Sequence, residues 1–275
     1  MRFALSAFAD EISPDLDVQV ATLKKLGVAG LDLRSVDGAN VTKLSDAQLD
    51  DVKAKCEANG LHVQAIGSPV NKVAMTPENR PIEMAKLRQS IHAAKRTGTD
   101  KIRIFSPEVP RGEDEAAWPE MQEWMGEQIA EAANSGILLL HENDAVFYGA
   151  YPDNAKRLFD KFGGDTFKAA FDFANTVLIG YRAKADWFPW VLPHLHTLHI
   201  KDARESEKKV YPAGEGDGQI EETLRWLIDQ GWNGPLTIEP HLASAGAFGG
   251  FSGEQLFEVA VTSLRKVVHA TGSEA

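Results

Sequence analysis

The segment ILLLHE, residues 137–142, is a short apolar run that ends in a carboxylate. Three later runs carry, at or near their ends, another residue that can bind a divalent cation: KAAFD at 168–172, HTLHI at 196–200 and PLTIE at 235–239. Short apolar runs bounded by turn residues are typical of buried strands. Four strand ends of this kind predict a metal site if the strands lie side by side.

The same type of run recurs along the chain and alternates with helical segments, without a Pro/Gly/Ser-rich linker. Helix signals include Ser13-Pro14 and Ser45 at helix starts and a glycine at each end. The predicted helical stretches are 15–27, 46–60, 84–98 and 127–136. The predicted strands are 2–8, 29–34, 61–67, 100–105, 137–142, 167–172, 196–201 and 235–239.

This alternation predicts an α/β fold, a single (β/α)8 TIM barrel domain over residues 1–275. A doubly wound sheet is the alternative, but it would usually carry a glycine-rich phosphate turn after its first strand. Here the first strand leads into Ala9-Asp10-Glu11 instead. The barrel is therefore the favoured fold.

Composition limits the function classes. The chain has 275 residues, 43% of them hydrophobic, and a formal net charge of −11, which disfavours nucleic acid as a partner. Its one cysteine, Cys56, excludes an internal disulfide, and the start shows no signal-peptide pattern. No apolar run reaches the roughly 18–20 residues of a membrane span. We expect a cytoplasmic enzyme or binding protein with no membrane partner.

Side-chain alternation tests whether the four strand ends point into the barrel. If Leu198 and Ile200 face the helices, then Thr197, His199 and Lys201 face the interior. The same reasoning turns Asp172 and Glu239 inward, whereas the fifth strand is apolar on both faces before Glu142. Three carboxylates and one imidazole suit one Mn²⁺ or Mg²⁺ ion and also admit Co²⁺ or Zn²⁺.

Several motifs together resemble the xylose isomerase-like TIM barrel superfamily, which contains sugar isomerases and epimerases and endonuclease IV-type repair enzymes. They are FADEISPDLDVQVATLKKLGVAGLDLR at 8–34, HEN at 141–143, FDFANT at 171–176, HIKDA at 199–203, PAGEGDGQI at 212–220 and IEPH at 238–241. The resemblance implies a metal held by Glu142, Asp172, His199 and Glu239, with the two glutamates also acting as the acid/base pair. Many epimerases have histidine where this chain has Asn175.

The residues themselves also suggest the chemistry. A divalent ion that binds a substrate carbonyl and a neighbouring hydroxyl stabilises an enediolate, and two carboxylates can then move the proton. We therefore expect a metal-dependent sugar isomerase or epimerase in which Glu142 and Glu239 are catalytic. A lyase or decarboxylase of a keto-sugar or sugar acid would use the same intermediate. A DNA repair nuclease would need more histidines and a basic groove, and a non-catalytic sugar-binding barrel is a further alternative.

Other polar residues near the strand ends are candidates for substrate binding: Lys201, Asn143, Asn175, His241 and Arg103. Arg34 and Arg103 have inward parity and could instead pair with Asp32, which is the preferred interpretation. His141 should pack against a helix, and His194 and His196 should lie outside the inward face. The aromatic residues Phe147, Tyr148 and Tyr151 could stack on a sugar or pack within their own loop.

Two loops bear on specificity. The glycines of 212–220 could offer backbone N–H groups to a phosphate, but Glu215 and Asp217 would repel it. We therefore expect a small carbohydrate substrate, a non-phosphorylated ketose or polyol-derived compound. The glycine-rich segment 242–253, with Phe248 and Phe251, suits a lid or a contact between subunits of a homo-oligomer.

Overall fold

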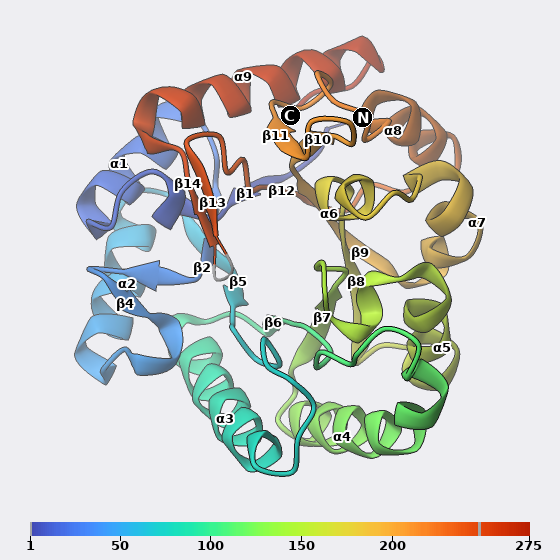
Figure 1. The fold of residues 1–275 in the computed structure, drawn as a ribbon. Helices are drawn as coiled ribbons and strands as arrows, with labels where there is room; N and C mark the ends of the chain where they lie inside the picture. The colour runs from blue at the N-terminus through green and yellow to red at the C-terminus, as the bar shows by residue number, and fades with distance from the viewer. Residues whose placement is uncertain (1, 247–248) are drawn as a thin grey trace.

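The computed structural model describes residues 2–246 and 249–275. Within this part of the chain, eight parallel strands close into a barrel in the order β1-β12-β9-β8-β7-β6-β5-β2 (Figure 1). They are β1 (Leu5–Ala7), β2 (Gly30–Leu33), β5 (His62–Gly67), β6 (Lys101–Ile104), β7 (Leu138–Glu142), β8 (Phe167–Asp172), β9 (Leu195–Ile200) and β12 (Leu236–Ile238). Each falls on one of the predicted ranges, so the predicted (β/α)8 barrel is confirmed.

The helices surround the barrel in chain order (Figure 1). Two of the predicted helix starts can be compared directly. Ser45 caps its helix in a capping box with Gln48, whereas the first helix is capped by Asp15 and not by Ser13. The helices are α1 (Leu16–Leu26), α2 (Asp46–Ala58), α3 (Asn79–Thr97), α4 (Asp114–Asn134), α5 (Pro152–Phe162), α6 (Phe173–Leu178), α7 (Phe188–Val191), α8 (Ile220–Asp229) and α9 (Gly253–Ala270).

Two helices begin earlier than predicted. The third starts at Asn79 and the fourth at Asp114, where the sequence pattern placed their starts at 84 and 127. The first turn of the third helix, NRPIE, has a single aliphatic residue, so its helical periodicity begins later. In the fourth helix, Met121, Trp124 and Met125 already have helical spacing before 127, and the prediction did not use them. Among the described residues, no helix has both the length and the apolar character that crossing a membrane requires.

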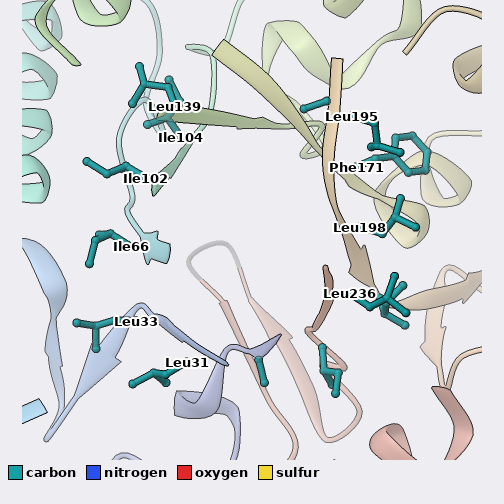
Figure 2. Close-up of a cluster of buried hydrophobic side chains, with 14 of the residues drawn as sticks. Leu31, Leu33, Ile66, Ile102, Ile104, Leu139, Phe171, Leu195, Leu198 and Leu236 are labelled. Carbon is teal, nitrogen blue, oxygen red and sulfur yellow. The ribbon is translucent and has the colours of Figure 1, made fainter. Parts of the chain in front are cut away.

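The main hydrophobic core lies between the strands and the helices. Figure 2 shows it as a ring of side chains that point from the barrel strands toward the surrounding helices. Phe171, Leu198 and Leu236 belong to this ring and are at most 1% exposed. Burying a leucine or phenylalanine side chain contributes roughly 2 kcal/mol. The predicted outward parity of these residues in β8, β9 and β12 is therefore confirmed.

The interior of the barrel is polar at one level. Ser6 Oγ lies 2.9 Å from Thr237 Oγ1, which in turn lies 3.1 Å from Thr197 Oγ1. These three hydroxyls come from β1, β12 and β9, which are neighbours in the barrel. These contacts show that Thr197 and Thr237 point into the barrel. Because side chains alternate along a strand, His199, two residues beyond Thr197 in β9, also points inward.

Three short hairpins, which the sequence pattern did not predict, extend the loops after β2, β9 and β12. They pair β3 (Ser35–Val36) with β4 (Ala39–Asn40), β10 (Asp202–Arg204) with β11 (Lys209–Tyr211), and β13 (Ser244–Gly246) with β14 (Gly249–Phe251). Each follows the carboxyl end of a barrel strand, where the active sites of such barrels lie. These hairpins therefore shape the mouth of the barrel.

Candidate active site

Four side chains converge at the mouth of the barrel. Glu142 ends β7, Asp172 ends β8, His199 lies in β9, and Glu239 directly follows β12. One potential ligand atom from each residue lies within 4.8 Å of the corresponding atoms of the others, and all four residues are buried. We call these residues the four-residue cluster. The expected convergence of the four strand ends is thus present in the structure.

Strand register explains the convergence. Asp172 pairs with His199 across β8 and β9, and His199 pairs with Thr237 across β9 and β12. The barrel order places β7, β8, β9 and β12 next to one another. Because paired residues on neighbouring strands share a face, the inward residues at this level meet at one point. Glu239 lies two residues beyond Thr237, so it joins them from the loop.

Atoms without a hydrogen-bond partner test whether a cation fits the cluster. Among the described residues, His199 Nδ1, Asp172 Oδ2 and Glu239 Oε2 are buried and make no hydrogen bond. His199 Nδ1 lies 3.2 Å from Glu142 Oε1 and 3.5 Å from Glu239 Oε2. Buried polar atoms are rarely left unpaired, and three carboxylates with one imidazole are a suitable donor set for a divalent cation. The cluster therefore could bind a metal ion.

The charges of the cluster shift the pKa values of its members. Burial alone would lower the pKa of His199, but the carboxylates of Glu142 and Glu239 raise it to about 10. Burial raises the pKa of Asp172 to about 6, although Lys201 opposes the shift. Burial also acts upward on Glu142, but His199 and Arg103 hold its pKa at about 2. Nearby positive charge thus stabilises the ionised carboxylates of the cluster, and a divalent cation would do the same.

Two arginines contact the glutamates of the cluster. Arg103 Nε lies 3.2 Å from Glu142 Oε2, and Arg34 Nη1 donates a 2.8 Å hydrogen bond to Glu239 Oε1. Arg34 Nε donates a second hydrogen bond, of 2.8 Å, to Asp10 Oδ2. The preferred interpretation, in which these arginines pair with Asp32, is therefore wrong. The two guanidinium groups pair with Glu142 and Glu239 instead.

Phe8 supports both arginines and the histidine. Its ring centroid lies 4.8 Å from the Arg34 guanidinium and 5.2 Å from that of Arg103. The ring also meets the His199 imidazole edge to face at 5.3 Å. A Cβ on Gly67 would lie 2.6 Å from the Phe8 ring, so only glycine leaves room for it. We did not anticipate this role for Phe8, although the residue directly follows the first strand.

Lys201 lies beside the cluster, as its inward parity predicted. Its Nζ is 3.0 Å from Asp172 Oδ2 and 3.8 Å from Glu239 Oε2. These carboxylates raise the pKa of Lys201 although burial opposes the shift. The lysine therefore stays cationic and favours the ionised form of its neighbours.

The two asparagines differ in how they are used. Asn143 accepts a hydrogen bond from the Asp172 N–H and donates to the Asp172 carbonyl and to Thr176 Oγ1, at 2.8–2.9 Å. Its amide thus holds the end of β8. Asn175 Nδ2 is buried without a hydrogen-bond partner in the described part of the chain, and its own N–H bonds to Asp172 Oδ1. Asn175 is consequently the asparagine with a donor still available.

His241 contacts the cluster through Glu239. Its Nε2 lies 3.3 Å from Glu239 Oε1 and 3.1 Å from Glu11 Oε1. Burial lowers the pKa of His241, but the two glutamates outweigh it and raise the pKa overall. Glu11, Glu239 and His241 also form a second buried group with ligand atoms within 4.8 Å of one another.

Glu11 ties the β13–β14 hairpin to this group. Its Oε2 accepts hydrogen bonds from the His241 N–H at 2.8 Å and from Ser252 Oγ at 3.0 Å. A Cβ on Gly250 would lie 2.0 Å from the His241 ring, so β14 packs directly on the imidazole. The hairpin therefore fixes His241 against Glu239. Phe248, predicted to be part of a lid or subunit contact, lies outside the described residues, and Phe251 is 42% exposed.

A cavity of about 310 Å³ opens above the cluster. Arg103, Lys201, Asn175 and His241, four of the five predicted substrate-binding residues, line it together with Glu142 and Glu239. Phe147 lines it too. Tyr148 is instead buried against Trp118, and Tyr151 packs on Arg111 and Tyr181. We call this space the mouth cavity.

His141 and His194 pack outside the barrel interior, as expected. His141 contacts Phe159 of α5 and Phe167, and its Nε2 is 3.1 Å from Ser106 Oγ. His194 stacks on Phe159 outside the barrel. The prediction that His141 packs against a helix is confirmed.

Comparison with known proteins identifies the family. A family model described as xylose isomerase-like TIM barrel matches residues 20–267. No curated protein sequence matches the chain.

Several solved structures share the fold. A D-tagatose 3-epimerase-like protein is 13% identical, with 99% of this chain and 98% of that chain covered and a TM-score of 0.78. D-Psicose 3-epimerase from Clostridium cellulolyticum H10, solved with D-tagatose, is 14% identical, with coverages of 98% and 99% and a TM-score of 0.73. A xylose isomerase-like TIM barrel protein from Mycobacterium smegmatis, in complex with magnesium, is 17% identical, with both coverages 98% and a TM-score of 0.70.

Proposed function

Because the chain belongs to the xylose isomerase-like TIM barrel family, we propose that it is a divalent-metal-dependent isomerase or epimerase acting on a small carbohydrate. The observation that carries this proposal is the buried convergence of Glu142, Asp172, His199 and Glu239 within 4.8 Å. The sugar epimerases among the structural neighbours support the same class of reaction.

The four-residue cluster would hold the ion. Mn²⁺ or Mg²⁺ suits its three carboxylates best, and the imidazole also admits Co²⁺ or Zn²⁺. When bound, the ion would polarise a substrate carbonyl and stabilise the negative charge that develops when the neighbouring carbon loses its proton. In this proposal Asp172 and His199 serve as ligands alone.

Glu142 and Glu239 would also transfer the proton. They come from β7 and β12, which two further strands separate in the barrel, so they can reach a substrate from different sides. Each glutamate has one oxygen near His199 and the other near an arginine. The arginines keep the carboxylates ionised and oriented, as a general base requires. One glutamate would remove the proton, and the other would return a proton to the opposite face or to the adjacent carbon.

The residues that line the mouth cavity would bind the sugar hydroxyls. Lys201, Asn175, His241 and Arg103 supply donors there, and Asn143 would act by holding Asp172 in place. The glycine-rich loop 212–220 is not a phosphate site in this proposal, because Asp202 accepts the N–H groups of Gly214, Gly216 and Gly218. This use of the loop supports a substrate that is not phosphorylated.

Solvent deuterium incorporation tests the proposal. Purified protein with Mn²⁺ is incubated with a panel of ketoses and keto-sugar acids in deuterated water, and the products are analysed by NMR and mass spectrometry. Deuterium on the carbon next to the carbonyl of an intact isomer or epimer is the expected result. Loss of carbon dioxide or of a leaving group would contradict it and would indicate a lyase or decarboxylase. The Glu142→Gln variant, which keeps the side-chain volume but cannot act as a base, should abolish the exchange.

A further inference from the structure

A second cavity of about 330 Å³ lies beside the mouth cavity and has a different chemical character. Five cationic residues line it: Arg34, Lys43, Lys72, Lys86 and Arg103. The neutral polar residues Asn40, Thr42 and Ser68 line it as well, and no carboxylate of the described residues does. We call this space the basic cavity. Such a concentration of positive charge is notable in a chain whose formal net charge is −11.

Three residues connect the basic cavity with the mouth cavity and with the two proposed catalytic glutamates. Lys72 and Arg103 line both cavities. Arg103 contacts Glu142, and Arg34 contacts Glu239, at 3.2 and 2.8 Å respectively. A ligand group in the basic cavity would therefore lie next to the two arginines that contact these glutamates.

Carboxylates outside the cavity lining balance most of the cations. Lys72 pairs with Asp144 at 2.7 Å and Lys86 with the buried Glu83 at 2.6 Å. Arg34 and Arg103 have the partners already described. Lys43 forms no ion pair with the described residues, and none of the hydrogen bonds in the described part of the chain comes from the Arg103 guanidinium. Lys43, an exposed residue at the edge of the cavity, is thus the lining cation that has no carboxylate partner among the described residues.

We propose that the substrate carries a carboxylate, which the basic cavity binds while the four-residue cluster acts on the carbonyl end. This inference rests on the proposed function, because it assigns the other end of the same substrate. A sugar acid would then be preferred over the neutral sugar. Guanidinium and ammonium groups are the usual partners of carboxylates, and partial desolvation strengthens the pairing.

The pairing of the lining cations argues for a carboxylate over a phosphate ester. A phosphate carries about −1.5 to −2 charges near neutral pH, whereas a carboxylate carries −1. Four of the five cations already face a carboxylate of the protein, so a ligand group with a single negative charge matches the one remaining cation, Lys43, better. The glycine-rich loop that could have bound phosphate is filled by Asp202.

Binding of matched probes tests the inference without turnover. D-Gluconate, neutral D-glucitol and D-glucitol 6-phosphate are titrated calorimetrically into the protein in EDTA, so that coordination to a metal ion contributes nothing. The wild type should bind gluconate at least tenfold more tightly than glucitol, and 0.5 M NaCl should reduce the difference. The Lys43→Gln variant should reduce the preference about three- to tenfold and Lys43→Glu should reduce it further. Lys25→Gln removes an exposed charge on α1 from a residue that lines neither cavity, so it is the matched control and should leave the preference unchanged.

The outcomes separate the two proposals. Equal affinity for gluconate and glucitol, or a preference that both Lys43 variants retain, would overturn the carboxylate site. Tighter binding of glucitol 6-phosphate than of gluconate would also overturn it. Because the titration needs neither metal nor catalysis, a failed deuterium experiment leaves its result valid. Conversely, if neutral ketoses exchange deuterium but the titration shows no preference for gluconate, only the carboxylate site is refuted.

Discussion

The two oxygens of Glu239 have different neighbours. Oε1 accepts a hydrogen bond from Arg34 at 2.8 Å and lies 3.3 Å from His241, whereas Oε2 faces His199 and Lys201 without a hydrogen bond. Burial acts to raise the pKa of Glu239, but Lys201 and the histidines hold it well below its usual value. One oxygen is therefore fixed by the protein, and the other remains for a cation or a substrate proton.

Replacing Glu239 with glutamine should remove both functions. The Glu239→Gln variant keeps the shape of the side chain but loses one of three carboxylate ligands, so we expect the affinity for Mn²⁺ to fall by at least about tenfold. The proposed isomerase activity should be abolished. Metal content after dialysis, measured by mass spectrometry, checks the first expectation, and His199→Ala provides an independent ligand variant.

Glu215→Gln is the matched control, because it removes a carboxylate from the exposed loop of 212–220. It should bind the metal as the wild type does. Unchanged metal content in both Glu239→Gln and His199→Ala would mean that the metal site lies elsewhere.

His141 should make stability depend on pH. Burial among Phe159 and Phe167 lowers the pKa of His141 to about 4, although Glu142 acts in the opposite direction. In the unfolded chain this group binds a proton near pH 6.5. The stabilisation from the neutral ring is therefore fully present above pH 6.5 and is lost as the pH falls toward 4. Linkage gives a loss of about 3 kcal/mol in the free energy of unfolding at pH 4.

Urea unfolding at pH 7 and pH 4.5 measures this effect in the wild type and in His141→Gln. Glutamine can still bond to Ser106 Oγ, which lies 3.1 Å from the imidazole, but it does not titrate in this range. The variant should lose less stability between the two pH values than the wild type does. Parallel losses in the two proteins would show that other groups cause the acid sensitivity.

At the scale of elements, one buried carboxylate organises the loop after β9. Asp202, the first residue of β10, accepts backbone hydrogen bonds from Ala203, Gly214, Gly216 and Gly218 at 2.8–3.1 Å. A Cβ on Gly216 or Gly218 would lie 2.3 or 2.7 Å from Asp202 Oδ1, so glycine is required at both positions. The glycine-rich motif thus serves to wrap an internal carboxylate.

The Asp202→Ala variant should destabilise this loop. Four backbone N–H groups lose a charged acceptor, and since hydrogen bonds to charged groups contribute about 1.5–3 kcal/mol each before water replaces some of them, we expect a net loss of about 3 kcal/mol. The free energy of unfolding in urea measures it. Asp217→Ala in the same loop removes one exposed hydrogen bond, to Glu205 N, and should cost less than about 1 kcal/mol. Equal losses in the two variants would contradict the organising role of Asp202.

At the scale of the whole molecule, the barrel strands were predictable because each is a compact apolar run. Alternation then fixed the inward phase of β9 and β12, as the contact between Thr197 and Thr237 shows. The hairpins after β2, β9 and β12 were missed because their strands are two or three residues long and carry no periodicity. The start of α3 at Asn79 was missed because its first turn is poor in apolar residues, whereas the start of α4 at Asp114 was missed although Met121, Trp124 and Met125 have helical spacing.

The groups that surround the four-residue cluster were less predictable. Arg34 and Glu239 are separated by 205 positions, so their ion pair follows from barrel closure and has no local signature. Parity placed Arg34 inside the barrel but could not distinguish Asp32 from Asp10 or Glu239 as its partner. The acidic pair Asp10-Glu11 was the available signal for a partner of Arg34. It follows the first strand and therefore lies at the same end of the barrel as the four ligand candidates.

Metal binding should stabilise the whole barrel. The four-residue cluster draws on β7, β8, β9 and β12, so an ion held there would cross-link half of the strands and bind the folded state alone. At a free Mn²⁺ concentration of about 100 times Kd, linkage gives about 2.7 kcal/mol, which for a chain of this size raises Tm by roughly 5 °C. Differential scanning calorimetry with Mn²⁺ and with EDTA measures the shift, and Asp172→Asn, with a weakened ligand set, should show a much smaller one. An equal shift in this variant would place the stabilising ion outside the cluster.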